Sequence, residues 1–305
     1  MRMLVIGAGS TGGYFGGRLA QAGRDVTFLV RPARAEHLRA HGLEIVSPHG
    51  NFTLRPQLVT AGGIKEPFDI VLLTVKAYSL EAALADLAPA VGPSTMILPV
   101  LNRMKHVDVL GARFGRKAVV GCACKVAAVV DEQGRIVQLS PLQQIVYGEL
   151  DGSSSPRIID LDAFMQGAGF ETRLSMTIAR DMWEKWILLA TLGSVTCVMR
   201  GNVGEIEAAS GGLEFVLRMF DEVVAIAKAA GTAPSEGFLV EAKATLTAKG
   251  STFTSSMYRD LLKGRPIEAD QIVGDLLVRG GRAGVATPLL AAAYTHLSVY
   301  QNRLS

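Results

Sequence analysis

The segment that most constrains the fold is a glycine-rich turn near the N-terminus. The residues Gly7-Ala8-Gly9-Ser10-Thr11-Gly12 follow a short apolar run, Met3–Ile6, and open a helical segment, Tyr14–Ala22. A second apolar run, Asp25–Val30, comes next. Strand, glycine turn, helix and strand within about 30 residues form one βαβ unit, so this pattern predicts two parallel strands joined by a crossover helix.

The order of glycines in this turn is the one that dinucleotide-binding loops use. Gly7 permits the tight turn, Gly9 lets a pyrophosphate approach the backbone, and Gly12 lets the helix pack against the strand. The N-terminus of the helix offers backbone N–H groups and partial positive charge to the phosphates. We therefore expect a dinucleotide at this loop.

The end of the second strand predicts which dinucleotide binds. Enzymes that use NAD place a carboxylate there to hold the ribose 2′-hydroxyl. This chain has Arg31 instead, with Arg34 nearby and no acid before Glu36. An arginine pairs with a 2′-phosphate, which a carboxylate would repel, so the predicted cofactor is NADP.

Strands and helices continue to alternate after this unit. Apolar runs at Ile70–Val75 and Thr95–Val100 are separated by helical segments, which predicts an α/β fold with a doubly wound parallel sheet. Ala118–Val130 and Ile136–Gly148 show no helical period and are expected to extend the sheet in antiparallel fashion. We predict that residues 1–175 form a Rossmann-like NADP-binding domain.

The remaining residues, 176–305, read as helices and predict an all-helical domain for substrate binding and dimerisation. A chain of 305 residues fits two domains. The expected helices are Thr177–Met199, Leu213–Ala230, Glu236–Lys249, Ile267–Gly280 and Pro288–Arg303.

Composition excludes several classes of protein. A net charge of +3 without a long basic run disfavours nucleic acid as a partner. No signal peptide or membrane-spanning stretch is recognisable, so we expect a cytoplasmic protein.

Cys122 and Cys124 are expected on one face of a buried strand rather than in a metal site. His37 and His41 have no third ligand in view, so no metal is expected.

Three segments carry candidate chemistry for a nicotinamide reductase. Lys76 follows a buried strand and Asn102 follows the next one, at the edge where doubly wound sheets bind ligands. Lys185 stands between Trp183 and Trp186 at the start of an apolar helix. Partial desolvation would lower the pKa of Lys185 toward a useful value. The alternative for Lys185 is a surface pair with an aspartate four residues earlier.

With these features together, the sequence resembles the ketopantoate reductase (2-dehydropantoate 2-reductase) family over essentially its whole length. The resemblance rests on the glycine loop and on a late block with matching serine-to-glutamate spacing. The further matching residues are Arg31, Lys76, Asn102, Trp183, Lys185, Ser255 to Asp260, Glu268 to Asp270, and Gly274.

The resemblance implies roles for the residues of the helical domain. Lys185 would be the general acid that protonates the developing alkoxide, and Glu268 would orient the lysine and the substrate. Ser256 would contact the substrate carboxylate, while Asn102 and Lys76 would line the cleft for nicotinamide and substrate. The alternatives are a carboxylate at a helix start for Glu268 and a turn or capping residue for Ser256. A homodimer is also compatible with the apolar helices.

Three positions depart from the family pattern and predict an altered substrate pocket. Leu189 and Gly193 replace asparagines four and eight positions after the lysine, and Arg103 replaces a glycine after Asn102. Leucine adds an apolar wall, and Gly193 is expected to open space. The default substrate is ketopantoate, in pantothenate biosynthesis. The alternatives are a reductase of another 2-oxo acid and a catalytically silent NADPH-binding regulatory protein.

Overall fold

The computed structural model describes residues 1–75, 79–102 and 104–304. Its contacts divide the chain into two units. One unit comprises Met1–Leu101 with His106–Ala179, and the other comprises Asn102–Lys105 with Arg180–Ser305. Each unit has its own cluster of buried apolar side chains, so each has a core of its own.

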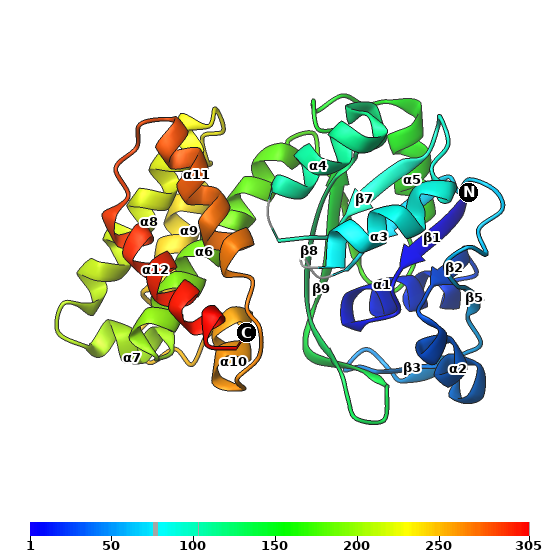
Figure 1. Cartoon of the computed structure of the whole chain (residues 1–305), viewed down its shortest axis with the longest axis horizontal. Helices are drawn as coiled ribbons and strands as arrows, with labels where there is room; N and C mark the ends of the chain where they lie inside the picture. The colour runs from blue at the N-terminus through cyan, green and yellow to red at the C-terminus, as the bar shows by residue number, and fades with distance from the viewer. Residues whose placement is uncertain (76–78, 103, 305) are drawn as a thin grey trace. The chain divides into compact units, whose positions relative to one another are not determined.

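The N-terminal unit (Figure 1) is built on a five-stranded parallel sheet, and the hydrogen bonds between its strands give the order β5-β2-β1-β6-β7. The strands are β1 (Arg2–Ile6), β2 (Asp25–Leu29), β5 (Gln57–Val59), β6 (Ile70–Leu73) and β7 (Met96–Pro99). Helices α1 (Ser10–Gln21), α2 (Pro32–His41), α3 (Leu80–Leu87) and α4 (Lys105–Phe114) lie between strands in the sequence. The predicted doubly wound parallel sheet is confirmed. The edge strand β5 was not predicted, because its three partly exposed residues form no apolar run.

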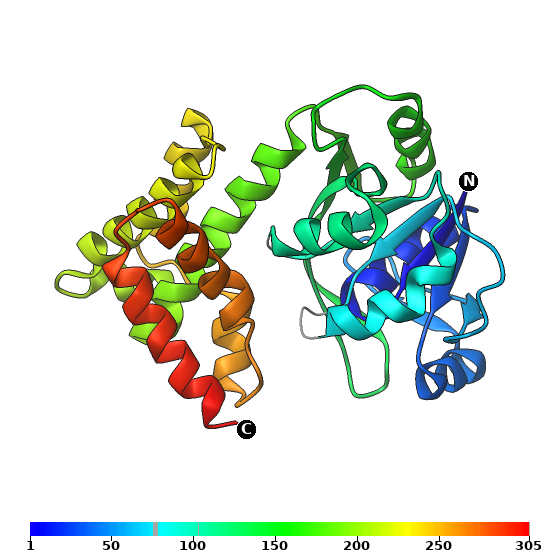
Figure 2. The same cartoon turned by 45° about the horizontal axis from the view of Figure 1, so that its top comes forward.

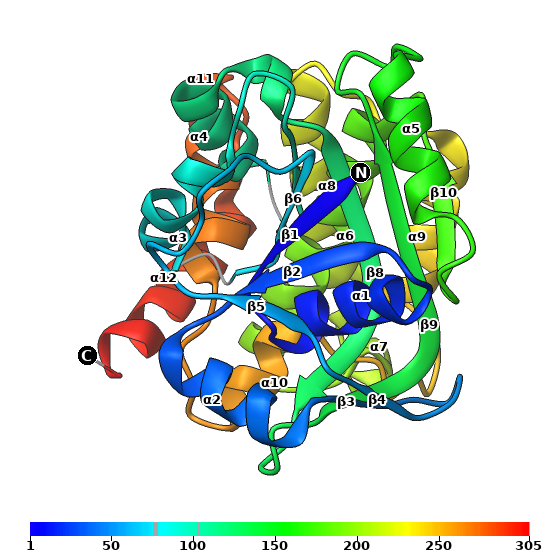
Figure 3. The same cartoon turned by 90° about the vertical axis from the view of Figure 1, so that its right-hand side faces the viewer.

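A second sheet in this unit corrects the expectation of an antiparallel extension. The chain leaves the first sheet after Val120, whose N–H donates to the carbonyl of Ile97 at 3.0 Å. Strands β8 (Gly121–Val130) and β9 (Ile136–Gly148) then pair antiparallel in a separate sheet. Its other strands are β3 (Leu43–Val46), β4 (Phe52–Leu54) and β10 (Glu171–Leu174), in the order β10-β9-β3-β4, and α5 (Pro156–Met165) precedes β10. Figure 3 shows the long β8–β9 hairpin curving past α1.

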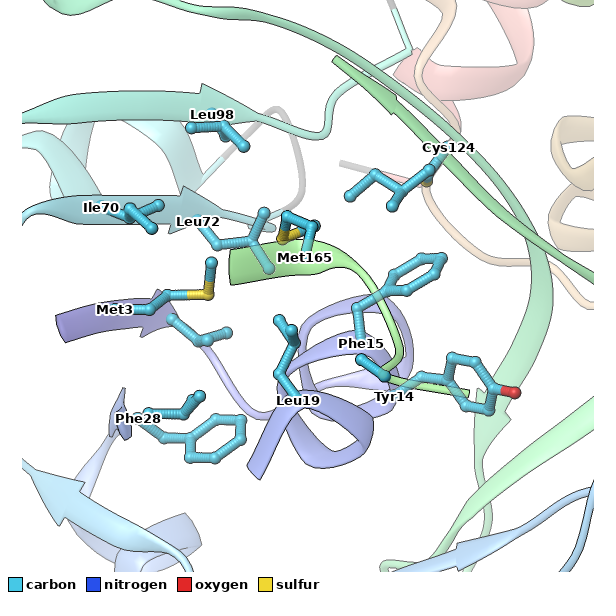
Figure 4. Packing of buried hydrophobic residues seen from close by; sticks show 14 of the residues in the cluster. Met3, Tyr14, Phe15, Leu19, Phe28, Ile70, Leu72, Leu98, Cys124 and Met165 are labelled. Carbon is cyan, nitrogen blue, oxygen red and sulfur yellow. The ribbon is translucent and has the colours of Figure 1, made fainter. Parts of the chain in front are cut away.

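Helix α1 packs against both sheets, and glycines make this possible. A Cβ on Gly16 would lie 2.8 Å from the ring of Phe28 in the first sheet. A Cβ on Gly13 would lie 2.1 Å from the side chain of Ile136 in the second sheet. Glycine lowers helix stability by about 1 kcal/mol per residue, which the close packing of two layers offsets. Figure 4 shows the resulting core, in which Phe15 and Leu19 of α1 lie among buried side chains.

The helical unit is centred on α6 (Ile178–Met199) and α8 (Gly212–Ala229). Helices α11 (Asp275–Arg282) and α12 (Pro288–Asn302) each pack against α8 and against the π-turn η4 (Asp270–Gly274) (Figure 2). The remaining elements are α7 (Val203–Ala208), α9 (Glu236–Leu246) and α10 (Ser256–Leu262). In the described part of the chain, none of the helices has the length and apolar character needed to cross a membrane.

Two differences from the sequence prediction matter for the site. The expected continuous helix Ile267–Gly280 begins instead as the π-turn η4 and becomes α-helical only at Asp275. Helix α10 was also missed, because its seven residues are too few to show a clear helical period. Both segments carry residues that the sequence assigned to the substrate.

Candidate active site

The glycine loop connects β1 to α1 at the carboxyl edge of the parallel sheet. Gly7 has a φ of +93°, which only glycine adopts without strain. Gly9 is exposed and caps α1, and a Cβ placed there would meet no atom within 4 Å. A Cβ on Gly12 would lie 2.2 Å from Oγ1 of Thr74 and 2.4 Å from the carbonyl oxygen of Gly7. Each of the three positions therefore favours glycine for a different physical reason.

This geometry fits a dinucleotide. The space above Gly9 leaves the backbone open to a phosphate, and the N-terminus of the twelve-residue helix α1 points its N–H groups there. Thr74, which the sequence prediction did not identify, donates its hydroxyl to the carbonyl of Ile6 at 2.9 Å. This hydrogen bond holds the segment after β6 against the start of the glycine loop. Ala8 is buried, and Ser10 and Thr11 form the first turn of α1.

The two arginines after β2 are placed differently. Arg31 caps α2 with extended backbone and has an exposed side chain, so it is available to a ligand at the end of β2. Arg34 is half-buried, and its Nε donates to the carbonyl of Ala8 in the glycine loop at 3.3 Å. Lys76 and Arg103, for which roles or effects were predicted, lie outside the described residues.

Lys185 lies on α6 and is half-buried. Its neighbours Trp183 and Trp186 are buried, with ring centroids 4.9 Å apart. The guanidinium of Arg279 lies over both rings and is bound to Asp275 at 3.1 Å. The tryptophans therefore anchor the first half of α6 in the core of the helical unit and hold the backbone of Lys185 in place.

Glu268 is tied to α6 through the turn that follows it. Its carbonyl accepts the N–H of Ile272 at 2.9 Å, and the carbonyl of Ile272 accepts the indole N–H of Trp186 at 2.9 Å. Two short links therefore connect Glu268 to the residue directly after Lys185. The π-turn is braced by Tyr294, which donates to Asp270 at 2.7 Å, a hydrogen bond that raises the pKa of the tyrosine.

Gly274, part of the matching late block, has a packing role in the same turn. A Cβ there would lie 3.0 Å from the ring of Tyr294. The π-turn was not visible in the sequence, because its apolar spacing resembles that of an ordinary helix. Such turns occur frequently at functional sites.

Ser256 lies at the start of α10, and the structure assigns the capping role to its neighbour. The hydroxyl of Ser255 accepts the N–H of Tyr258 at 2.9 Å and lies 2.9 Å from Oγ1 of Thr196 on α6. Ser256 itself is exposed. Its predicted contact with a substrate stays a prediction, while the alternative that it caps the helix is wrong.

At Gly193, where the sequence predicts open space, the end of one flexible side chain lies close by. Gly193 is buried, and a Cβ there would lie 2.6 Å from the terminal methyl of Met257. The methionine methyl would have to move aside for a larger residue, which its flexible side chain permits. Leu189, one turn earlier on α6, is half-buried, and Asn102 is half-buried in the segment after β7. Their roles toward a substrate are untested.

Comparison with known proteins identifies the fold and the family. The family model described as ketopantoate reductase PanE/ApbA matches residues 3–152, and the model of its C-terminal part matches residues 177–301. The chain belongs to the ketopantoate reductase family. It is an oxidoreductase of the 2-dehydropantoate 2-reductase type.

Two similar proteins match nearly the whole chain. An uncharacterized oxidoreductase, YkpB of Bacillus subtilis (strain 168), is 34% identical over 301 residues, 99% of each chain. The 2-dehydropantoate 2-reductase from Geobacter metallireducens GS-15 superposes with a TM-score of 0.88 at 28% identity, over 98% of this chain and 99% of that one.

A solved structure of a dehydrogenase with another printed activity has a similar fold. The ternary structure of D-mandelate dehydrogenase with NADH and anilino(oxo)acetate has a TM-score of 0.88 at 20% identity, over 100% of this chain and 99% of that one. At this identity the likeness concerns the fold alone. The fold by itself therefore decides neither the 2-oxo acid nor the choice between NADH and NADPH.

Proposed function

We propose that the protein is a cytoplasmic NADPH-dependent reductase that converts a 2-oxo acid into a 2-hydroxy acid, with ketopantoate, in pantothenate biosynthesis, as the default substrate. Residues 1–175 bind the cofactor and residues 176–305 bind the substrate and support a homodimer. The observation that carries the proposal is the connection of Glu268 to Lys185 through Trp186 and the π-turn. These hydrogen bonds connect the segment of the Glu268 carboxylate to the helix that carries the Lys185 ammonium. Both segments belong to the helical domain, which follows the domain with the glycine loop.

The bound cofactor would supply a hydride to the substrate carbonyl carbon. The residues of this chain have three tasks around that transfer. Lys185 holds a proton on Nζ, stabilises negative charge that develops on the carbonyl oxygen, and donates the proton to it. Glu268 orients the lysine and the substrate. Ser256 offers a hydroxyl to the substrate carboxylate from the first turn of α10.

Retention of Lys185 and Glu268 favours an enzyme over a silent NADPH-binding regulatory protein, because binding alone needs neither. The choice of NADP is supported by the exposed Arg31 after β2 and by the absence of an acid at that position. Lys76 and Asn102 complete the proposed contacts to cofactor and substrate.

A spectrophotometric assay tests the function. NADPH oxidation would be followed by absorbance with ketopantoate and with a panel of 2-oxo acids that carry larger or more apolar tails. We expect turnover with at least one member and weak turnover with ketopantoate, because Leu189 offers no hydrogen bond where the family has an amide. A kcat/KM for ketopantoate above about 10⁴ M⁻¹s⁻¹ would restore it as the ordinary substrate. No oxidation with any oxo acid, despite tight NADPH binding, would favour the regulatory protein.

A further inference from the structure

Arg34 joins three parts of the N-terminal unit. It lies on α2, one helical turn after Arg31. Its Nε donates to the carbonyl of Ala8 in the glycine loop at 3.3 Å, and its Nη1 donates to the carbonyl of Gly134 at 2.9 Å. Gly134 belongs to the turn between β8 and β9. The guanidinium is therefore held between the dinucleotide loop and the tip of the second sheet.

The charge of Arg34 has no protein counter-charge. Both of its hydrogen bonds go to neutral carbonyls, and among the described residues no carboxylate pairs with it. Its Nη2 is enclosed without a hydrogen-bond partner in this part of the chain. One carboxylate of the turn, Asp131, is bound by Arg135, which donates to it at 2.8 Å.

The surroundings of Arg34 respond to this charge. Burial and the charge of Arg34 lower the pKa of His37, one turn further along α2. Burial also lowers the pKa of Arg34 itself. A half-buried cation without an anion is costly in a folded protein unless a ligand supplies the missing negative charge.

We propose that Arg34 is a second specificity-determining residue for NADP, acting through a charge fixed beside the glycine loop, while Arg31 makes the direct contact with the 2′-phosphate. The inference rests on the proposed function, since it deepens the cofactor choice at that site. The 2′-phosphate adds negative charge at the ribose, which dinucleotide folds place after β2. An arginine clamped in a partly enclosed place is screened less than an exposed one, and it loses little side-chain entropy on binding.

The test compares cofactor affinities rather than turnover. The dissociation constants of NADPH and NADH would be measured by isothermal titration for the unmodified protein and for Arg34→Gln, Arg34→Lys and Arg39→Gln. The smaller probes 2′-AMP and 5′-AMP would be titrated alongside. Arg39 is exposed on the same helix, so Arg39→Gln removes the same charge away from the loop.

Arg34→Gln should weaken NADPH and 2′-AMP by about tenfold while NADH and 5′-AMP change by less than about twofold. Arg34→Lys should keep most of the preference, and Arg39→Gln should keep all of it. Equal losses for NADPH and NADH in Arg34→Gln would show that the residue only supports the loop, and an unchanged ratio would show no role in selection. Either result overturns the inference and leaves the proposed function standing, whereas an unmodified protein that binds neither dinucleotide overturns both.

Discussion

Two alanine substitutions in the glycine loop should have opposite effects on stability and binding. Gly12→Ala places a methyl 2.2 Å from Oγ1 of Thr74 and 2.4 Å from the carbonyl oxygen of Gly7. The threonine side chain can rotate, but the carbonyl belongs to the backbone of the loop. Relief therefore requires the loop and α1 to separate. Gly9→Ala places its methyl in open space, on a residue whose φ of −86° any amino acid adopts.

The expected sizes follow from these distances. Overpacking against backbone should cost Gly12→Ala about 3 kcal/mol, which lowers Tm by about 6–12 °C for a unit of this size. For Gly9→Ala, the smaller entropy of the unfolded chain offsets the poorer helix cap, so Tm should stay within about 2 °C. Its methyl nevertheless occupies the approach of the pyrophosphate, and NADPH affinity should fall by at least about 30-fold, or about 2 kcal/mol.

Differential scanning calorimetry without ligand and titration calorimetry with NADPH separate the two effects. A Gly9→Ala protein that binds NADPH as tightly as the parent would refute the assignment of this loop to the pyrophosphate. A Gly12→Ala protein with unchanged Tm would refute the argument that the third glycine is required by packing. The unmodified protein and one surface variant, Arg39→Gln, serve as controls for both measurements.

Other predictions concern catalysis, acid stability and the substrate pocket. Lys185→Ala should lower kcat by about 10²–10⁴ while the Kd for NADPH is unchanged, and near-normal turnover in steady-state assays would assign the proton to another group. The hydrogen bond from Arg157, at 2.7 Å, lowers the pKa of the buried Glu149 carboxyl. Because that pKa is depressed, the stabilisation is present above the unfolded-state pKa and is lost as pH falls through the folded-state value. Arg157→Ala should therefore destabilise by about 2–3 kcal/mol at pH 7, after allowance for the partly exposed arginine, and urea unfolding at about pH 3 should show a clearly smaller difference. Gly193→Asn should raise kcat/KM for ketopantoate more when it is combined with Met257→Ala, because the methionine methyl lies 2.6 Å from the position of the new Cβ; an equal gain in Gly193→Asn alone, measured against both single variants and the parent, would contradict this packing argument.

Much of the parallel sheet could be predicted because its signals are local. The apolar runs of β1, β2, β6 and β7 and the glycines after β1 depend only on neighbouring residues, and the structure confirms them. The buried strand pair Cys122 and Cys124 was predicted for the same reason, and both thiols are buried on β8. Short or partly exposed elements such as β5 and α10 lack such a pattern, so they were missed.

The sequence by itself determined the glycine loop between β1 and α1, the alternation of strands and helices, and the residue types predicted to act in catalysis, because spacing along the chain encodes all three. Only the tertiary structure decided which segments meet. The tie from Trp186 to the π-turn after Glu268 spans 86 positions in the sequence. The methyl of Met257 over Gly193 and the contact of Arg34 with Ala8 likewise join distant segments. No local pattern encodes such contacts, because they depend on how whole helices and sheets pack against one another.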